Sequence, residues 1–364
     1  MPHKLNIALL YGGNSGEHEV SLQSAASVFH ALDKEKYNVI PIAIDKTGNL
    51  FVHEAKALES YKDTLPVYLD SARAIPSLIE NGRFILDVQC VFPAIHGSLY
   101  EDGCLQGILE TANVAYVGCD VLSSAVGMDK DITRQLVCKE DLHCARYSLI
   151  QWHMSPEQKS RVIEHIAALC GFPLFVKPCS LGSSVGIQKI HSISEALSAV
   201  NNALNYDKAV LIEEFINGRE IEVAILENRQ LNLAPKSSIP GEIRITHEDG
   251  FYSYNAKYIN SNKSELIIPA ELQEDIIQSI QQKALMVFTR LKCRGMARVD
   301  FFVHKETNEI FFNEINTLPG FTPISMYPKL WQASGLTYSN LLDELIELAL
   351  SHHAARLQRI TSYL

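Results

Sequence analysis

The sequence predicts an α/β fold, because apolar runs typical of strands alternate with segments whose apolar residues recur at helical spacing. Neither an internal repeat nor a low-complexity linker interrupts this alternation. With 364 residues, of which 47% are hydrophobic, the chain can form two or three domains with sizeable buried cores.

The first predicted element is a strand at residues 6–11, followed by a turn at residues 12–16 and a helix from about Glu17. The helix is predicted from apolar residues near helical spacing, namely Val20, Val28, Phe29 and Leu32. Further strands are predicted at residues 39–44, 88–95 and 114–117.

A second region begins with a predicted helix near Ser123 and contains strands at residues 174–177 and 186–190. The later elements are two strands and a long helix, at residues 210–213, 221–226 and 273–291. The chain therefore continues in the same α/β pattern beyond its first region.

Residues 298–316 read RVDFFVHKETNEIFFNEIN and predict two strands joined by a polar turn. Asp300 lies on the first strand, and Glu314 and Asn316 share one face of the second. Two carboxylates and an amide are suitable oxygen ligands for Mg²⁺ beside a nucleotide. A half-exposed hairpin with solvated acids is the more common structure for such a pattern, but the apolar run before Glu314 favours the metal site.

The overall charge restricts the class of partner. The 42 acidic residues outnumber 32 basic ones and give a net charge of −10, which argues against general nucleic-acid binding. The eight cysteines form no C-x-x-C pair, so neither a zinc ribbon nor a dithiol motif is predicted. With no signal-like run and no segment of about 20 apolar residues, we expect a soluble, reduced, cytoplasmic protein without a membrane span.

The glycine turn after the first strand has the spacing G-G-x-x-G, which is not the G-x-G-x-x-G of dinucleotide-binding folds. No P-loop motif occurs anywhere in the chain. The turn places Glu17 at a helix N-terminus beside the carboxyl end of a strand, where α/β sheets bind ligands. Glu17 is therefore a candidate for holding a substrate ammonium, although an acid that only complements the helix dipole is the simpler interpretation.

A second candidate site for phosphate is the loop at residues 177–186, KPCSLGSSVG. Lys177 ends a predicted buried strand, and the following glycines and serines, including Ser183 and Ser184, offer backbone N–H groups and hydroxyls. Such a loop can cradle phosphate and close as a lid, and Lys130 could supply a second cation. Glycine- and serine-rich turns are common, so the lysine is what makes this hypothesis specific.

Glu213 and Glu220 flank a short loop that could hold an adenosine. One carboxylate would accept from the exocyclic amine of adenine and the other from the ribose hydroxyls. As isolated acids beside a loop, both would more often face solvent.

Nine stretches in order resemble the D-alanine–D-alanine ligase family of the ATP-grasp superfamily, over about residues 6–348. They are GGNSGEHEVS (12–21), AIHG (94–97), EDGCLQG (101–107), MDK (128–130), VKPCSLGSSVG (176–186), LIEEFINGRE (211–220), NAKY (255–258), ARVDFF (297–302) and NEINTLPGFTPIS (313–325). The resemblance implies an ATP-grasp fold of three α/β domains, with ATP between the central and C-terminal ones. We place the Rossmann-like N-terminal domain, the central subdomain and the C-terminal subdomain with the metal site at residues 1–125, 126–216 and 217–364.

For the nucleotide, the resemblance assigns Asp300, Glu314 and Asn316 to two Mg²⁺ ions, which Mn²⁺ could replace. The remaining nucleotide contacts that it implies are phosphate groups for Lys130, Lys177, Ser183 and Ser184, the adenine amine for Glu213, the ribose for Glu220 and the transferring phosphoryl group for Lys257.

For the amino acids, the resemblance implies that two D-alanines are joined through an acyl phosphate, for peptidoglycan precursor synthesis. Arg298 and the backbone N–H of Gly320 would stabilise the tetrahedral oxyanion. The other implied roles are the first ammonium for Glu17 and His96, the second carboxylate for Ser325, and a hydrogen-bonded lid triad for Glu17, Ser183 and Tyr258. For His96, capping of the strand before it is an equally weighted alternative.

Two other functions remain open from the sequence. D-alanine–D-lactate ligases of this family typically have phenylalanine where this chain has Tyr258, which favours the dipeptide product, while D-serine is less easily excluded. A catalytically silent ATP-binding regulator would be expected to lack metal or oxyanion residues, and Arg298, Asp300, Glu314 and Asn316 are all present. We expect ATP and D-alanine as small-molecule partners and a homodimer.

Overall fold

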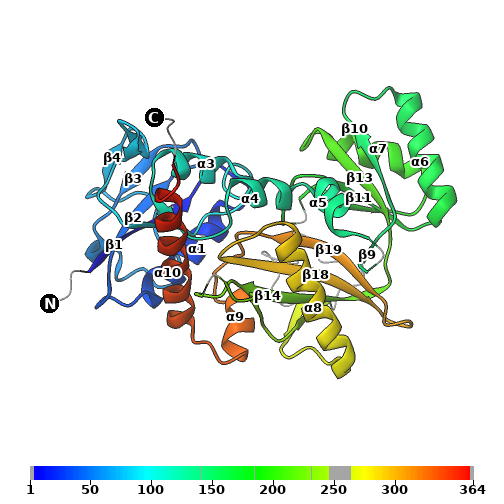
Figure 1. Cartoon of the computed structure of the whole chain (residues 1–364). Helices are drawn as coiled ribbons and strands as arrows, with labels where there is room; N and C mark the ends of the chain where they lie inside the picture. The colour runs from blue at the N-terminus through cyan, green and yellow to red at the C-terminus, as the bar shows by residue number, and fades with distance from the viewer. Residues whose placement is uncertain (1–3, 140, 184, 231, 246–263, 361–364) are drawn as a thin grey trace.

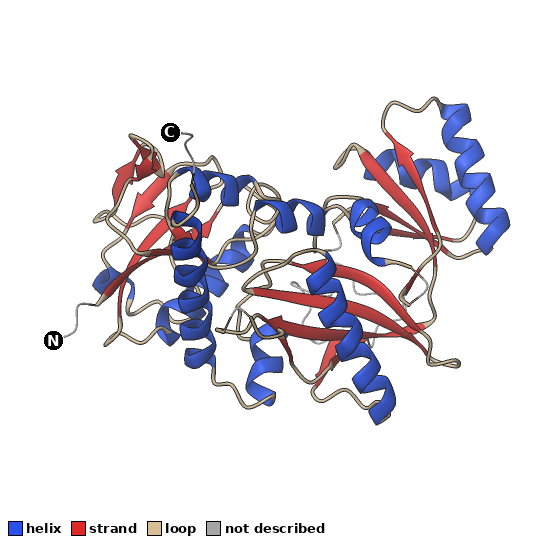
Figure 2. Ribbon diagram, in the orientation of Figure 1, coloured by secondary structure: helices blue, strands red, loops and turns tan. Residues whose placement is uncertain are grey.

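The computed structural model describes residues 4–139, 141–183, 185–230, 232–245 and 264–360. It confirms the α/β prediction, with three main sheets of six, four and seven strands, each packed against helices (Figure 1). Figure 2 shows the same three groups of strands with helices between and around them.

The N-terminal sheet has the order β4-β3-β2-β1-β7-β8. Its strands are β1 (Leu5–Gly12), β2 (Tyr37–Ile44), β3 (Leu50–Val52), β4 (Arg73–Ile75), β7 (Cys90–Pro93) and β8 (Ala115–Tyr116). β1 pairs in parallel with both β2 and β7, and it is almost entirely buried, as expected for a central parallel strand. The remaining elements of this region are α1 (His18–Ala31), α2 (Ala55–Leu58), β5 (Ile79–Glu80), β6 (Arg83–Phe84) and α3 (Cys104–Thr111).

Two short helices connect the first region to the second, α4 (Val121–Met128) and α5 (Lys130–Val137). The prediction of one helix near Ser123 is therefore incomplete. The side chain of Asp129 accepts from the backbone N–H groups of Asp131 and Ile132, which starts a new helix at Lys130. Lys130 consequently lies in the first turn of α5 rather than inside a longer helix.

The central sheet is antiparallel, in the order β10-β13-β11-β12. Its elements are β10 (Tyr147–Gln151), α6 (Pro156–Cys170), β11 (Leu174–Pro178), β12 (Gln188–Ile190), α7 (Ile193–Ala203) and β13 (Ala209–Glu214). Apolar residues of α6 and α7 pack with those of the strands in one core. β12 begins two residues later than the predicted strand, because Gly186 adopts a positive φ of 73°.

The third sheet runs β17-β16-β14-β18-β19-β9, with β15 paired to β14. Its strands are β9 (His143–Cys144), β14 (Gly218–Leu226), β15 (Lys236–Ser237), β16 (Gly241–Ile245), β17 (Ser264–Ile267), β18 (Met296–His304) and β19 (Ile310–Asn316). The long helix α8 (Glu274–Arg290) packs its apolar side against β14 and β18, close to its predicted position (Figure 1).

The last two helices, α9 (Met326–Ala333) and α10 (Tyr338–Leu357), return toward the N-terminal region. Leu341, Leu345 and Ile346 of α10 share one core with residues of β1, α1 and β7. α10 therefore joins the two ends of the chain, as its position beside α1 in Figure 1 shows. The domain boundaries near residues 125 and 217 stay a prediction. In the described ranges, no helix has both the length and the apolar character needed to cross a bilayer.

Candidate active site

The turn after β1 brings Glu17 to the start of α1. A side chain on Gly12 would meet the carbonyl oxygen of Ile44 at 2.2 Å, and the φ of Gly12 is 90°, so only glycine fits this turn. The backbone N–H of Gly13 donates to the same oxygen at 2.7 Å. Glu17 is the N-cap residue of α1 and is 8% exposed. The predicted placement of this carboxylate at a helix N-terminus is confirmed.

Glu17 meets the phosphate loop across the molecule. The hydroxyl of Ser183 donates a hydrogen bond to Oε1 of Glu17. Ser183 has a φ of 53°, a left-handed conformation that is uncommon for serine and is typical of functional sites. The contact links the N-terminal region directly to the loop between β11 and β12.

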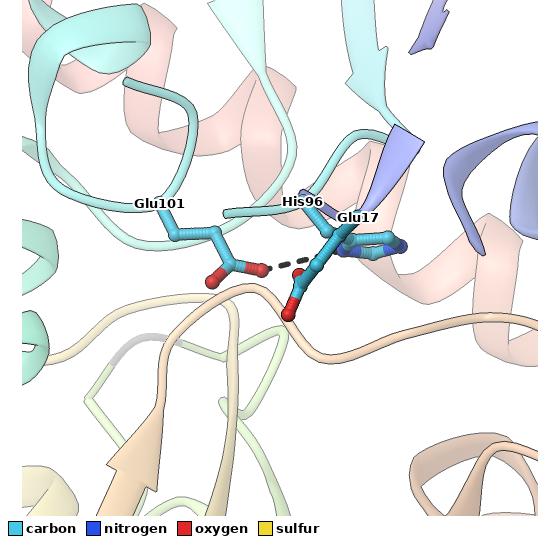
Figure 3. Close-up of side chains that lie close together, drawn as sticks. All are labelled: Glu17, His96 and Glu101. Carbon is cyan, nitrogen blue, oxygen red and sulfur yellow. Dashed lines mark hydrogen bonds and ion pairs between the residues drawn. The ribbon is translucent and has the colours of Figure 1, made fainter. Parts of the chain in front are cut away.

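His96 and Glu101 lie on the other side of Glu17. His96 Nδ1 is 3.3 Å from a carboxylate oxygen of Glu101, and its Nε2 is 3.0 Å from the hydroxyl of Ser24. Figure 3 shows the Glu101 carboxylate directed at the imidazole ring, with Glu17 beside it. Potential ligand atoms of Glu17, His96 and Glu101 all lie within 4.8 Å of one another. The two buried carboxylates of this group, Glu17 and Glu101, suit a cation with several N–H donors, such as an ammonium.

The protonated form of His96 is stabilised by its surroundings. Burial opposes the charge, but the hydrogen bond and charge of Glu101, together with the charge of Glu17, raise the pKa of His96 above its ordinary value of 6.5. The His96–Glu101 pair should therefore stabilise the fold fully below about pH 6.5 and lose this contribution as pH rises through the higher, folded-state pKa.

We expect Glu101→Gln to lower the free energy of unfolding by about 1–2 kcal/mol near pH 6, and by less at alkaline pH. Urea unfolding at several pH values measures this difference. Glu110→Gln is the matched control, because Glu110 pairs with Arg294 and Arg356, which stay charged throughout. A loss for Glu101→Gln that did not change with pH would show that Glu101 does not stabilise a protonated His96.

The predicted metal hairpin is formed by β18 and β19. Asp300 is the register partner of Glu314, and Arg298 is the partner of Asn316, with a bulge directly after Asp300. The predicted convergence of the three oxygen ligands on one face is thus present. Among them, Asp300 is only 2% exposed, whereas Glu314 is partly open to the cavities described below.

Arg298 holds the Asp300 carboxylate in a two-point contact. Nε of Arg298 donates to Oδ1 at 2.8 Å and Nη2 donates to Oδ2 at 2.7 Å. The neighbouring strand adds Glu222, whose carboxylate lies 2.9 Å from the same Nε. Burial opposes the charge of Arg298, but these two acids raise its pKa well above the ordinary value. A permanently charged guanidinium is therefore held in a fixed orientation beside the hairpin ligands.

A cavity of about 480 Å³ lies between the central and third sheets. Five predicted nucleotide or metal residues line it, namely Lys130, Lys177, Glu213, Glu220 and Glu314. Lys177 contacts one carboxylate oxygen of Glu213, and Arg134 donates to the other at 2.6 Å. Burial opposes the charge of Glu213, but Arg134 and Lys177 lower its pKa to about 2. Glu213 is therefore ionised at neutral pH and can accept from a further N–H donor.

A second cavity, of about 140 Å³, adjoins the first and shares Lys130 and Glu314 with it. Its other predicted residues are Glu17, His96, Ser183, Arg298, Asn316, Gly320 and Ser325. At its boundary, Nζ of Lys130 lies 3.4 Å from Glu314 and donates to the carbonyl oxygen of Leu181 at 2.6 Å. A cation and an acid thus stand at the junction of the two cavities.

Ser325 and Gly320 close the far side of the smaller cavity. Ser325 is the N-cap residue of α9, and its hydroxyl accepts from the backbone N–H of Thr322 at 2.9 Å. A side chain on Gly320 would lie 2.9 Å from that hydroxyl, so the turn approaches it closely. The helix N-terminus and the hydroxyl together favour a carboxylate at this end.

In the described part of the chain, thirteen of the predicted site residues lie in or beside the two cavities. Asp300 lines neither cavity itself, but it is held by Arg298, which lines the smaller one. Ser184, Lys257 and Tyr258 lie outside the described residues. Glu101, Arg134 and Glu222 were not among the functional residues predicted from the sequence. Each is a charged residue that the fold buries against a predicted site residue. Glu222 could have been found from the sequence, because it is the one acid in the predicted apolar strand at 221–226.

Two family profiles match most of the chain. The profile described as D-ala D-ala ligase N-terminus matches residues 6–119, and the one described as D-ala D-ala ligase C-terminus matches residues 136–347. A curated D-alanine–D-alanine ligase of Legionella pneumophila is 56% identical over the whole length of both chains. The chain belongs to the D-alanine–D-alanine ligase family.

Other members of this family confirm the ATP-grasp fold. The D-alanine–D-alanine ligase A of Bradyrhizobium diazoefficiens is 42% identical, with 98% of each chain covered. The solved D-alanine–D-alanine ligase of Coxiella burnetii superposes with a TM-score of 0.81 at 37% identity, covering 98% of this chain and 96% of that one. The VanG D-Ala:D-Ser ligase of Enterococcus faecalis gives 0.79 at 35% identity, covering 95% and 100%. The Bacillus anthracis D-alanine–D-alanine ligase complexed with ATP gives 0.71 at 26% identity, covering 97% and 99%.

Proposed function

We propose that this protein joins two D-alanine molecules into D-alanyl-D-alanine, with ATP converted to ADP and phosphate, for the synthesis of peptidoglycan precursors. The observation that carries this proposal is the pair of adjoining cavities that share Lys130 and Glu314. The larger cavity suits a nucleotide, and the smaller one has an acidic end for an ammonium and a helix N-terminus for a carboxylate. A phosphoryl group at the junction would reach a carboxylate in the smaller cavity.

The donor set of the hairpin fits magnesium. Asp300, Glu314 and Asn316 supply oxygen atoms from one face, which is the ligand chemistry that Mg²⁺ prefers. When bound, Mg²⁺ would offset the charge that gathers on the phosphate oxygens during transfer. We propose that these three residues hold it, with Arg298 keeping Asp300 oriented.

In the first step, the carboxylate of one D-alanine attacks the γ-phosphorus of ATP and ADP leaves, which produces an acyl phosphate. Glu17, with His96 beside it, anchors the ammonium of that D-alanine. Lys130 and Lys177 hold phosphate oxygens, while Glu213 and Glu220 accept from the adenine amine and the ribose. Because attack brings negative oxygens together, the lysines lower the barrier through their charge.

In the second step, the amine of the other D-alanine attacks the acyl carbon. Ser325 and the N-terminus of α9 hold its carboxylate. Arg298 has N–H donors beyond those that contact Asp300, and with the backbone N–H of Gly320 it stabilises the tetrahedral oxyanion until phosphate leaves. Glu17 and Ser183 close the site against water, which would otherwise hydrolyse the acyl phosphate.

We assign three further roles to residues outside the described ranges: a phosphate contact for Ser184, a contact to the transferring phosphoryl group for Lys257, and a lid hydroxyl for Tyr258.

We also propose that the protein acts in the cytoplasm as a homodimer. Its eight cysteines are all free thiols, outside any disulfide, which suits a reducing compartment. Exposed apolar side chains on α3 and α4, including Ile108 and Leu122, support self-association, which light scattering measures.

The proposed function is tested by measuring phosphate release with Mg²⁺ and ATP against D-alanine, D-serine, D-lactate and L-alanine. Phosphate release that requires D-alanine, with D-alanyl-D-alanine as the product, is the expected result. D-serine belongs in the panel because a D-Ala:D-Ser ligase is among the similar solved structures. ATP cleavage independent of any D-amino acid would contradict the proposal.

Tyr258 provides a test of product choice. We expect Tyr258→Phe to lower the dipeptide rate by roughly tenfold, the size of one lost hydrogen bond. We also expect it to gain D-alanyl-D-lactate synthesis, most visibly below neutral pH, where the competing amine is largely protonated. Tyr254→Phe removes a hydroxyl from the same stretch of sequence and is the matched control. If no ester forms at any pH, Tyr258 does not determine the product.

A further inference from the structure

Two cysteines lie close together at the edge of the third sheet that is formed by β9. Cys138 directly follows α5, and Cys144 belongs to β9. Between them, Lys139 and Leu142 form an antiparallel bridge. The backbone N–H of Leu142 donates to the carbonyl oxygen of Lys139 at 3.0 Å. This bridge brings the two thiols into hydrogen-bonding contact.

The thiol pair is open to small molecules. Both cysteines are only half-buried, and both line a third cavity of about 600 Å³. The chain holds a second thiol pair, Cys119 and Cys293, but both of those residues are buried. A soluble oxidant would therefore reach the Cys138–Cys144 pair much more readily.

The surroundings make Cys144 the more reactive thiol. The hydrogen bond from Cys138 and the charge of Arg134 lower the pKa of Cys144, against the effect of burial. The same hydrogen bond and burial raise the pKa of Cys138. Cys144 is thus suited to act as the thiolate nucleophile, with Cys138 as the second thiol that completes a disulfide.

A short chain of contacts leads from this pair to the nucleotide cavity. Arg134 lies within electrostatic reach of both thiols and donates to Glu213 at 2.6 Å. Glu213 in turn contacts Lys177, and both of these residues line the nucleotide cavity. The segment from Glu214 to Ile216 also borders the nucleotide cavity and the thiol cavity together.

We propose that Cys138 and Cys144 form a reversible disulfide when the protein meets a hydroperoxide, and that this bond weakens nucleotide binding. The Cys144 thiolate attacks one peroxide oxygen, which becomes its sulfenic acid, and the other oxygen leaves as hydroxide or alkoxide. The Cys138 thiol then attacks the Cys144 sulfur, and water leaves as the S–S bond forms. The two thiols are oxidised by two electrons, which reduce the peroxide, and a thiol reductant reverses the reaction.

The new bond would act on Arg134. It ties Cys138, at the end of the helix α5 that carries Arg134, to β9, and so restrains this end of the helix. Arg134 would then hold Glu213 less well, and Glu213 would no longer orient Lys177 and the adenine amine. This consequence rests on the proposed nucleotide site, whereas disulfide formation does not.

Disulfide formation is tested by peptide mapping. The protein is treated with hydrogen peroxide, alkylated and digested with trypsin, which cleaves after Lys139 and so separates residues 135–139 from residues 140–146. We expect these two peptides to be linked, and the link to be lost with dithiothreitol or in Cys138→Ser and Cys144→Ser. Cys104→Ser is the matched control, because Cys104 is an exposed thiol away from the pair, and it should keep the link. If Cys104 is oxidised while the two peptides stay separate, the disulfide is wrong.

The coupling is tested by calorimetry of ATP binding to reduced and oxidised protein. We expect oxidation to raise the Kd for ATP roughly threefold to tenfold in the unmodified sequence and in Cys104→Ser. It should leave the Kd unchanged in Cys138→Ser and Cys144→Ser, and dithiothreitol should restore it. An unchanged Kd in protein that contains the linked peptides would overturn the coupling. Failure of the reduced protein to bind ATP would overturn the proposed function, and with it the coupling, while peptide mapping would still decide the disulfide.

Discussion

Replacing Glu314 by glutamine is expected to lower D-alanine-dependent phosphate release by roughly 10²- to 10³-fold. Glu314 stands where the two cavities meet, opposite Asp300 across the hairpin and 3.4 Å from Lys130. Glutamine keeps the shape of the side chain and removes its charge. The metal would therefore lose a charged ligand, and Lys130 would lose its acidic partner, while the packing of the hairpin stays the same.

Initial rates over a range of Mg²⁺ concentrations measure this effect, and thermal unfolding shows whether the fold is intact. Glu306→Gln is the matched control, because Glu306 is an exposed acid in the turn of the same hairpin. It should keep its activity. A near-normal rate for Glu314→Gln, with the same dependence on Mg²⁺, would remove Glu314 from the metal site.

Arg298→Lys is expected to lower kcat by roughly 10²-fold or more, with little change in the Kd for ATP. Nε and Nη2 of Arg298 hold both oxygens of Asp300, at 2.8 and 2.7 Å. A lysine ammonium carries the same charge but cannot make this planar two-point contact and donate to the oxyanion as well. The substitution therefore affects the orientation of Asp300 and the stabilisation of the transition state together.

Single-turnover rates measure the loss of catalysis, and calorimetry measures the Kd for ATP separately. Arg290→Lys is the matched control, since Arg290 makes a similar two-point contact with Asp141 at 3.2 and 2.7 Å, outside the lining of both substrate cavities. A variant of Arg298 with normal kcat and a raised KM for ATP would identify Arg298 as a nucleotide ligand and not as the oxyanion donor.

The hairpin could be predicted from the sequence because its geometry is local. Side chains two residues apart in a strand share a face, so the spacing of Glu314 and Asn316 was sufficient to place them together. The same rule explains why Arg298 can hold Asp300. The glycine turn that places Glu17 at the start of α1 is likewise a local feature, since Gly12 can have no side chain there.

Long-range pairs could not be predicted in this way. Arg134 and Glu213 are far apart in the sequence, and their contact depends on how α5 packs beside β13. The break between α4 and α5 at Asp129 was missed although aspartate is a preferred N-cap residue, because its capping contact depends on the local backbone and not on the periodicity of apolar residues. The helix α10 was not predicted from the sequence, so its packing on the N-terminal region was missed as well. The apolar residues of a helix do not by themselves specify which surface it will cover.

The most direct test of ligation through an acyl phosphate follows oxygen atoms. The protein is incubated with ATP, Mg²⁺ and D-alanine whose carboxylate oxygens are the heavy isotope, and the released phosphate is analysed by mass spectrometry. If the carboxylate attacks the γ-phosphorus, one heavy oxygen stays with the phosphate when the second amine displaces it, and D-alanyl-D-alanine forms in equal amount. Phosphate whose new oxygen comes only from the solvent would show that ATP is hydrolysed without an acyl phosphate, and would contradict the proposed function.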